Sequence, residues 1–288
     1  MKTRTKKRKT FWIAAGLFAV LFLFAALLAL RGDLRFCLTN GIARALARGA
    51  MPERTEPACR EIPLDTLLAS PDVSVRSDLL RIDSAHPLPE DFTPLLAEYG
   101  ESGVRATEET LAAYAALAAD ALEACGEKLL VVAAYRTEKE QRAAIAEEGE
   151  FAAAVGASEH QAGLALDLCV RGYGGLSFLK TAAGRYANKN CSRYGLIVRY
   201  PADKTAITGI PYEPWHFRYV GSPHAGIIEK NALALEEYLA FFEPGAWYVY
   251  GDFLLSRQKG PVLSLPENAS SVLLSPDGEG NWFLTVRY

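Results

Sequence analysis

The sequence predicts an α+β protein: a small antiparallel sheet with flanking helices, preceded by one transmembrane helix and followed by a short β-rich C-terminal appendage. Three observations support this fold class. Between residues 78 and 243, short strand-like runs alternate with alanine-rich helical segments. Residues 11–30 form a long apolar stretch that contains no charge. After residue 243, short apolar runs are separated by Gly, Pro and Asn turns.

The amino-terminal residues predict a membrane anchor. Residues 1–10 carry six Lys or Arg and no acid, and residues 11–30 are twenty apolar residues without a charge. A helix of that length spans a hydrocarbon core of ~30 Å, and the preceding basic residues favour a cytoplasmic N-terminus. A cleaved signal peptide is the alternative, although its apolar region is usually ~7–15 residues long. We therefore expect a single-pass membrane protein whose main domain is extracytoplasmic.

Charge and cysteine content restrict the partners. Six of the 31 basic residues lie in the cytoplasmic tail, so the rest of the chain carries 25 basic against 34 acidic residues, which argues against nucleic acid. The five cysteines show no C-x-x-C spacing and do not indicate a structural zinc site. Cys37–Cys59 and Cys169–Cys191 are the disulfides to test first. The sequence fixes neither this connectivity nor the oligomeric state.

The remaining elements are predicted from local patterns. Residues 31–77, interrupted by prolines, are interpreted as a stalk or linker with one short helix near residues 38–48. In the main domain, residues 78–243, we expect strands at residues 78–83, 129–135, 164–170, 196–200 and 215–220. We expect helices there at residues 107–125, 137–148, 178–191 and 233–242. In the appendage, residues 244–288, strands are expected at residues 247–255, 262–265, 271–274 and 282–288.

Two stretches carry the residues of a metal-dependent hydrolase. They are Ser158-Glu-His-Gln-Ala-Gly-Leu-Ala-Leu-Asp167 and Glu213-Pro-Trp-His216. Together they supply two imidazoles and one carboxylate as ligands, plus a second carboxylate. Three ligands drawn from His and Asp leave a fourth tetrahedral position for water, which distinguishes a catalytic zinc from a closed structural one. Glu213 is the candidate to accept the proton of that water and to donate one to the leaving amine.

Spacing tests whether His160 and Asp167 can share one ion. On a straight helix the two residues would lie ~10 Å apart, and on an unbroken strand they would point to opposite faces. The chain must therefore bend between them, and Gly163 allows a bend at the least steric cost. We expect His160 in a loop and Asp167 in the strand that follows. Because a proline comes after Glu213, Glu213 should lie in a turn, with His216 opening the next strand.

These motifs resemble those of the VanY-type zinc D-alanyl-D-alanine carboxypeptidases, which belong to the superfamily shared with lysostaphin-like peptidases and the hedgehog signalling domain. The likeness runs from about residue 82 to residue 242. Further stretches that carry it are His86-Pro-Leu-Pro-Glu-Asp-Phe92, Tyr135-Arg136-Thr137 with Gln141, Tyr194-Gly-Leu-Ile-Val-Arg-Tyr-Pro201, Thr208-Gly209, and the continuation of the second motif to Gly221. The chain departs from the family pattern at Thr137, where Ser is usual, and at Phe178, where Trp is expected.

The resemblance implies a role for each site residue. One catalytic Zn²⁺ would be held by His160, Asp167 and His216, with Glu213 as general acid/base. Arg136 would face the scissile carbonyl or the terminal carboxylate of the substrate, a role that suits the fork of donors on a guanidinium. The substrate-binding residues implied are Arg136, Ser158, Gln141 and Trp215.

The expected function is that of a membrane-anchored zinc carboxypeptidase of the bacterial envelope. Its partner would be a peptidoglycan stem peptide ending in D-Ala, from which it removes that residue. Alternatives are an L,D-carboxypeptidase acting on tetrapeptide stems, a non-catalytic module that retains zinc and binds cell wall, and an iron oxygenase with a two-His-one-carboxylate triad. Glu213 and Arg136 favour hydrolysis, because zinc retention alone requires neither.

Overall fold

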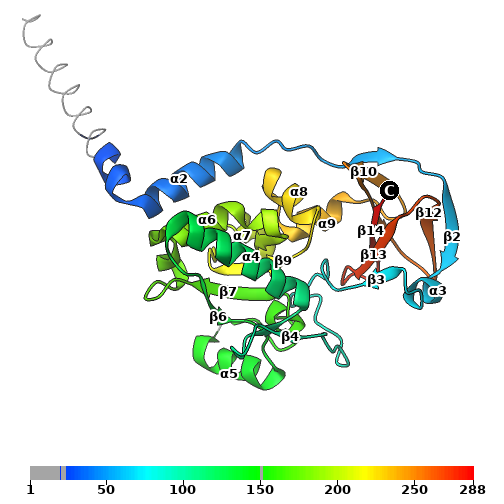
Figure 1. Cartoon of the computed structure of the whole chain (residues 1–288), viewed down its shortest axis with the longest axis horizontal. Coiled ribbons are helices and arrows are strands. Elements are labelled where there is room, and N and C mark those ends of the chain that lie inside the picture. Colours follow the sequence, from blue (N-terminus) through cyan, green and yellow to red (C-terminus); the bar gives the residue numbers. More distant parts are fainter. Residues whose placement is uncertain (1–19, 21–23, 150–151) are drawn as a thin grey trace, which may run out of the picture.

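The computed structural model describes residue 20, residues 24–149 and residues 152–288. Figure 1 shows a body of helices packed on a sheet beside a second, β-rich part that contains the C-terminus. Helices and mainly antiparallel sheets both occur, which confirms the predicted α+β class.

The sheet of the body has four antiparallel strands in the order β6-β7-β9-β8. They are β6 (Leu130–Ala133), β7 (Ala165–Cys169), β8 (Leu196–Val198) and β9 (His216–Tyr219). All four were predicted, and each is shorter than expected. In the central pair, Asp167 lies opposite His216. Directly opposed residues of an antiparallel pair have Cβ atoms only ~5 Å apart, so this register brings the two side chains together.

Helices α4 (Glu108–Cys125) and α5 (Glu138–Glu148) confirm two predicted helices, and a threonine caps each of them. The Thr107 side chain accepts a hydrogen bond from the Thr110 amide, and Thr137 forms a capping box with Glu140. One face of α4 packs on the sheet, and the shared core contains Leu117. The core residues that α4 meets on the sheet and beyond it include Leu166, Phe178, Leu196 and Phe217.

The helix predicted at residues 178–191 is divided into three pieces. They are the 3-10 helix η3 (Gly175–Lys180), the α-helix α6 (Ala182–Asn190) and the 3-10 helix η4 (Cys191–Tyr194). The division occurs because Thr181 has an extended ψ of 152° and its side chain caps α6 by accepting from the Gly184 amide. The other short elements of the body are β4 (Ala97–Glu98), β5 (Arg105–Ala106), η2 (Glu159–Ala162), η5 (Ala202–Lys204), α7 (Thr205–Thr208), α8 (His224–Lys230) and α9 (Leu235–Phe241).

No strand forms at residues 78–83, so that prediction was wrong. Asp83 makes only an isolated bridge to His86. The backbone groups of this segment bind elsewhere: the Leu79 amide donates to the Ser275 hydroxyl, and the carbonyls of Asp78 and Leu80 accept from a buried arginine. Because these groups already have partners, they are not available for a ladder.

The second part is a six-stranded sheet in the order β1-β10-β11-β14-β13-β3, together with the pair β12-β2. Its C-terminal strands are β10 (Trp247–Tyr250), β11 (Phe253–Gln258), β12 (Val262–Pro266), β13 (Ser271–Pro276) and β14 (Trp282–Arg287). Its N-terminal elements are β1 (Glu53–Thr55), β2 (Cys59–Pro63), α3 (Leu64–Leu68) and β3 (Val73–Val75). The two sets pair directly, β1 with β10, β2 with β12 and β3 with β13.

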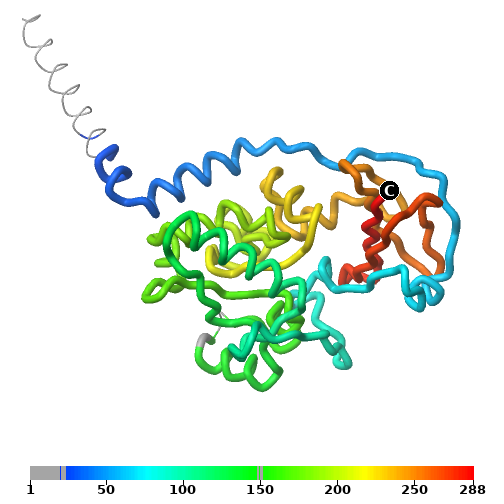
Figure 2. The backbone as a smooth tube through the Cα atoms, viewed as in Figure 1, coloured from blue at the N-terminus to red at the C-terminus, as the bar shows by residue number. Residues whose placement is uncertain are grey.

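These pairings differ from the predicted division of the chain. Residues 53–75 do not form a stalk but complete the sheet of residues 247–287, and Figure 2 shows this early segment running around the C-terminal strands. Leu67 of the early segment is buried in the same core as Leu254, Leu265 and Leu284. The expected strand at residues 247–255 is instead the hairpin of β10 and β11.

A buried histidine joins the body to this sheet. His224 Nδ1 lies 2.6 Å from the Tyr238 hydroxyl, and His224 Nε2 lies 2.9 Å from Thr285 Oγ1 of β14. Burial lowers the pKa of His224 to about 3, so the ring is neutral at physiological pH. His224 is thus a structural residue at the contact between α8, α9 and β14.

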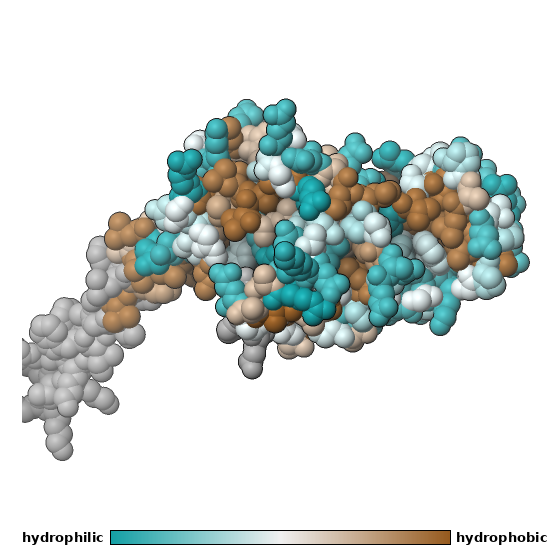
Figure 3. Space-filling view, turned by 90° about the horizontal axis from the view of Figure 1, so that it is seen from below, coloured by the Kyte–Doolittle hydropathy of each residue, from teal (hydrophilic) through white to brown (hydrophobic). Residues whose placement is uncertain are grey.

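The first labelled helix, α2 (Gly32–Ala45), begins directly after the apolar stretch. The predicted membrane span at residues 11–30 falls largely on positions outside the described residues. Among the residues that the structure describes, no helix is long and apolar enough to cross a membrane. Leu34, Leu38 and Ile42 are exposed on α2, and hydrophobic residues are visible on the surface next to the grey segment in Figure 3.

All five cysteines are free. Neither Cys37–Cys59 nor Cys169–Cys191 forms a disulfide, so both proposed pairings were wrong for this structure.

Gly163 has the bend that the spacing of the ligands predicts, with φ of 69°. A Cβ added there would lie 2.6 Å from Leu96 Cδ2. Gly126 has nearly the same φ, 70°, but a Cβ there meets nothing within 4 Å. We expect Gly163→Ala to lower the free energy of unfolding by about 1–3 kcal/mol more than Gly126→Ala, because only the first adds a clash to the backbone strain. Urea unfolding of both variants measures the difference, and equal losses would contradict the assigned role.

Candidate metal centre

Three side chains from separate elements converge on one point. Asp167 lies in β7, His216 opens β9 beside it, and His160 comes from η2 just before the bend. His160 Nε2 is 3.4 Å from Asp167 Oδ2, and His216 Nδ1 is 3.1 Å from Asp167 Oδ1. The three ligand atoms lie within 4.8 Å of one another, which is compatible with one shared metal ion.

The other nitrogen of each imidazole is engaged, which selects the ring nitrogen that faces the ion. His160 Nδ1 lies 2.7 Å from the carbonyl oxygen of Ala134, to which it must donate. His216 Nε2 lies 3.4 Å from Glu159 Oε2. When a metal ion replaces the ring proton, these contacts leave the coordinating lone pairs on His160 Nε2 and His216 Nδ1. Both free nitrogens point toward Asp167.

Glu159 is a buried anion behind the metal centre. Its carboxylate has no exposed surface and accepts hydrogen bonds from Arg199 Nε at 2.7 Å and Arg218 Nη1 at 2.6 Å. Burial by itself would raise the pKa of Glu159, but the two guanidinium groups and His216 outweigh it and lower the pKa. The carboxylate is therefore ionised and can orient the His216 ring.

The surroundings of Asp167 and His216 favour a bound cation. Burial disfavours ionised Asp167, yet the contacts with His160 and His216 lower its pKa. Burial lowers the pKa of His216, but hydrogen bonds to Asp167 and Glu159 outweigh it and raise the pKa to about 9. Asp167 Oδ1 is buried and lies 3.1 Å from His216 Nδ1. A divalent ion with nitrogen and oxygen ligands fits this donor set.

Glu213 lies at the edge of the metal centre, as the sequence predicts. It begins the turn before β9, and its Oε2 atom is 3.8 Å from His216 Nδ1. The Glu213 amide donates to the carbonyl oxygen of Tyr200 at 3.0 Å. The side chain of Asn188, on α6, donates to the carbonyl oxygen of Pro214 at 2.7 Å. Both contacts hold the turn and so position the Glu213 carboxylate.

A cavity of about 520 Å³ opens over the metal centre. All eight residues that the sequence analysis selected line it: Arg136, Gln141, Ser158, His160, Asp167, Glu213, Trp215 and His216. Arg136 Nη2 lies 3.5 Å from Asp167 Oδ2, and its amide donates to the carbonyl oxygen of His160. Gln141 donates from Nε2 to the carbonyl oxygen of Ala153, whereas its buried Oε1 accepts no hydrogen bond from the residues that the structure describes. Ser158 is also buried.

Several residues around the centre were not selected from the sequence. Glu159 stands between Ser158 and His160 in a polar run, so nothing in the local sequence indicated a buried charge. Tyr200 packs against His216 with ring centroids 4.9 Å apart and lines the cavity. Tyr212 lines it as well. Asn188 gave no local signal, because its partner lies 26 residues away in the chain.

The comparisons with known proteins agree with this geometry. The family model described as VanY, D-alanyl-D-alanine carboxypeptidase, matches residues 104–222. A curated D-alanyl-D-alanine carboxypeptidase from Enterococcus faecium is 33% identical over 171 residues, which are 59% of this chain and 54% of that protein. The bifunctional D-Ala-D-Ala dipeptidase and carboxypeptidase VanXYC from Enterococcus gallinarum is 38% identical over 54% of this chain and 90% of its own length. The chain thus spans about half of the first relative and nearly all of the second.

Two solved structures are similar at comparable identity. A mutant of the D,D-pentapeptidase VanY from a VanB-type resistance cassette, in complex with Zn(II), is 33% identical, with a TM-score of 0.50 over 56% of this chain and 98% of that one. The LD-carboxypeptidase LdcB is 33% identical, with a TM-score of 0.52 over 57% of this chain and 86% of that one.

The contact between Glu159 and His216 generates a prediction about metal binding. Glu159→Gln keeps the shape of the side chain but removes the charge that orients the ring, and we expect zinc affinity to fall about 10–100-fold. A competitive titration with a zinc-binding dye measures the affinity. Glu138→Gln, at an exposed site on α5, serves as the control. Unchanged zinc affinity in Glu159→Gln would show that the charge of Glu159 does not contribute to metal binding.

Proposed function

Because this chain belongs to the VanY family of D-alanyl-D-alanine carboxypeptidases, we propose that it is a zinc-dependent carboxypeptidase that hydrolyses the terminal D-Ala from peptidoglycan stem peptides. The observation that carries the proposal is the convergence of His160, Asp167 and His216 beside Glu213, under one cavity. The relatives support the same chemistry, since their names state D-Ala-D-Ala carboxypeptidase activity.

One zinc ion would be held by His160 Nε2, the Asp167 carboxylate and His216 Nδ1. When bound, such an ion polarises a carbonyl and lowers the pKa of water. The protein's own contribution is to hold these three donors in place. His160 is fixed by the Ala134 carbonyl, and His216 is fixed by Glu159.

Glu213 would act as the general acid/base. Its carboxylate is partly exposed to the cavity and close to His216 Nδ1, so it can take a proton from water on the open side of the metal centre. The same group can then pass the proton to the leaving amine. The turn that carries Glu213 is held by hydrogen bonds to Tyr200 and Asn188. These bonds would keep the Glu213 carboxylate beside the metal centre without making it a fourth ligand.

The cavity wall supplies donors and acceptors for a peptide that ends in a carboxylate. Arg136 would bind that carboxylate or the oxyanion that develops on the scissile carbonyl, because its guanidinium remains charged and is directed to the metal centre. Ser158 would donate its hydroxyl to the carboxylate. The buried Oε1 of Gln141 needs a donor, and a substrate amide would provide one. Trp215 would form part of the apolar wall.

An L,D-carboxypeptidase acting on tetrapeptide stems is the second candidate. The solved structure of an LD-carboxypeptidase resembles this chain as closely as that of a D,D-pentapeptidase does. A non-catalytic zinc-binding module and an iron oxygenase are less consistent with the site, because neither needs Glu213 or Arg136 at the cavity.

We also propose that the protein is anchored in the bacterial cell membrane through residues 11–30, with the body outside the cytoplasm. The support is the uncharged apolar stretch after a basic tail. The exposed side chains of Leu34, Leu38 and Ile42 on α2 also suit a position close to an apolar phase.

The role of Glu213 can be separated from metal binding. We expect Glu213→Gln to retain zinc, because no metal ligand is removed, but to release D-Ala about 10²–10⁴ times more slowly. Release of D-Ala from a pentapeptide stem and zinc content are measured side by side, with and without a chelator. Glu138→Gln is the control. Activity in Glu213→Gln within threefold of the unchanged protein would exclude Glu213 as the acid/base.

The preference for substrate length follows from the same assay. We expect the protein to convert a pentapeptide stem into a tetrapeptide and to leave the tetrapeptide intact. Mass spectrometry of the products distinguishes the two candidates. Release of D-Ala from the tetrapeptide alone would replace the D,D assignment with the L,D one.

A further inference from the structure

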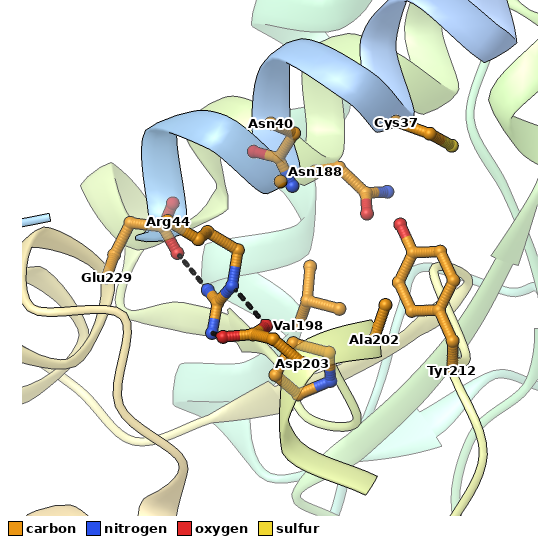
Figure 4. A pocket seen from close by; sticks show the side chains of 11 residues that line it. Cys37, Asn40, Arg44, Asn188, Val198, Ala202, Asp203, Tyr212 and Glu229 are labelled. Atoms are coloured by element: carbon orange, nitrogen blue, oxygen red, sulfur yellow. Dashed lines mark hydrogen bonds and ion pairs between the residues drawn. The ribbon is translucent and has the colours of Figure 1, made fainter. Parts of the chain in front are cut away.

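Helix α2 packs against a loop that forms part of the active-site wall. The loop comprises residues 201–212 and contains η5 and α7. Figure 4 shows α2 above this loop, with Arg44 reaching down from the helix to Asp203 and Glu229. Between helix and loop is a small pocket, about 90 Å³, which is too small for a substrate. The feature of this region that can affect function is therefore the contact between α2 and the loop.

Arg44 is the main polar link from α2 to the body. Its Nε atom is 2.6 Å from Asp203 Oδ1, and its Nη2 donates to the carbonyl oxygen of Ala232 at 3.3 Å. Its Nη1 lies 3.8 Å from Glu229 Oε2. The Arg44 side chain is only 11% exposed. The Arg44 guanidinium thus stands between two carboxylates. Without Arg44, the negative charges of Asp203 and Glu229 would lose the cation that they share.

The opposite end of the loop faces the substrate cavity. Ile210, Pro211 and Tyr212 all line that cavity. Tyr212 lines the small pocket under α2 as well, and in Figure 4 its hydroxyl points toward Asn188 and Cys37. Burial raises the pKa of Tyr212, consistent with a ring packed between the two sites. Tyr212 therefore contacts the α2 region and the active site at once.

A backbone hydrogen bond joins the two ends of the loop. The Glu213 amide donates to the Tyr200 carbonyl oxygen, so the residue after the loop is bonded to the residue before it. A second ion pair joins Lys204 to Glu237 of α9 at 2.8 Å. Asp203 and Lys204 are adjacent, so the start of the loop is held by α2 on one side and by α9 on the other.

We propose that α2 positions the active-site loop, with Arg44 as a positioning residue that holds residues 201–212 through Asp203 and thereby sets Tyr212 and Glu213 in the cavity. The inference rests on the proposed function for its kinetic consequence. The metal ligands come from η2, β7 and β9, not from this loop, so metal binding does not depend on Arg44.

The test compares Arg44→Ala, Arg44→Lys and Asp203→Asn in the full-length protein, with Arg48→Ala as a control at an exposed arginine near the end of the same helix. We expect Arg44→Ala and Asp203→Asn each to lower kcat/KM for D-Ala release roughly tenfold, since small displacements of positioned groups are costly. Zinc content should not change. Arg44→Lys should recover part of the loss. The double variant should lose no more than the worse single variant, because both act through one contact.

Hydrogen–deuterium exchange provides a readout that does not need activity. In Arg44→Ala and in Asp203→Asn, amides of residues 201–212 should exchange faster while those of β7 and β9 stay protected. Unchanged exchange in the loop, or full kcat/KM in both variants, would overturn the inference. If Arg44→Ala does not fold, Asp203→Asn, which leaves Arg44 with Glu229, decides the outcome. A wild-type protein that releases no D-Ala would reject the proposed function, whereas the exchange result would still decide the role of Arg44.

Discussion

The carboxylate of Glu159 is the charge around which the site is built. It is fully buried and shared by Arg199, Arg218 and His216. A lone carboxylate in such a position would be very costly, and removing one partner of a buried ion pair typically costs about 3–5 kcal/mol. The two arginines make the charge tolerable. The charge in turn orients the His216 ring, so an ion-pair network in the core determines the geometry of a proposed metal ligand.

The same network ties the site to distant parts of the chain. Arg199 also binds Glu236 of α9 through two hydrogen bonds, at 2.6 and 3.1 Å. Arg218 donates to the carbonyl oxygens of Asp78 and Leu80. These two residues lie in the segment that follows β3 and connects the second sheet to the body. Each guanidinium thus binds Glu159 and a second part of the chain at the same time. The metal centre is stabilised by α9 on one side and by the segment before the body on the other.

Local sequence patterns predicted the bend between two of the proposed metal ligands but not the second sheet. His160, Gly163 and Asp167 lie within eight residues, and their spacing alone required a bend. By contrast, β1 and β3 are three residues each, too short for a periodic signal, and they pair with strands about 200 residues later in the chain. The ion pairs of Glu159 span 40 and 59 residues. Pairings over such distances depend on tertiary packing, which no local window contains.

The proposed metal ligands and the proposed acid/base lie on different kinds of structural element. Asp167 and His216 are opposite each other in a central strand pair, where ladder hydrogen bonds and the core beneath them restrict movement. Glu213 is instead in a turn, next to a loop that the Arg44–Asp203 and Lys204–Glu237 ion pairs join to α2 and α9. The strand pair therefore fixes two of the three proposed ligands. The turn that carries Glu213 is held separately, by the Tyr200 carbonyl and the Asn188 side chain, so the proposed acid/base is positioned independently of them.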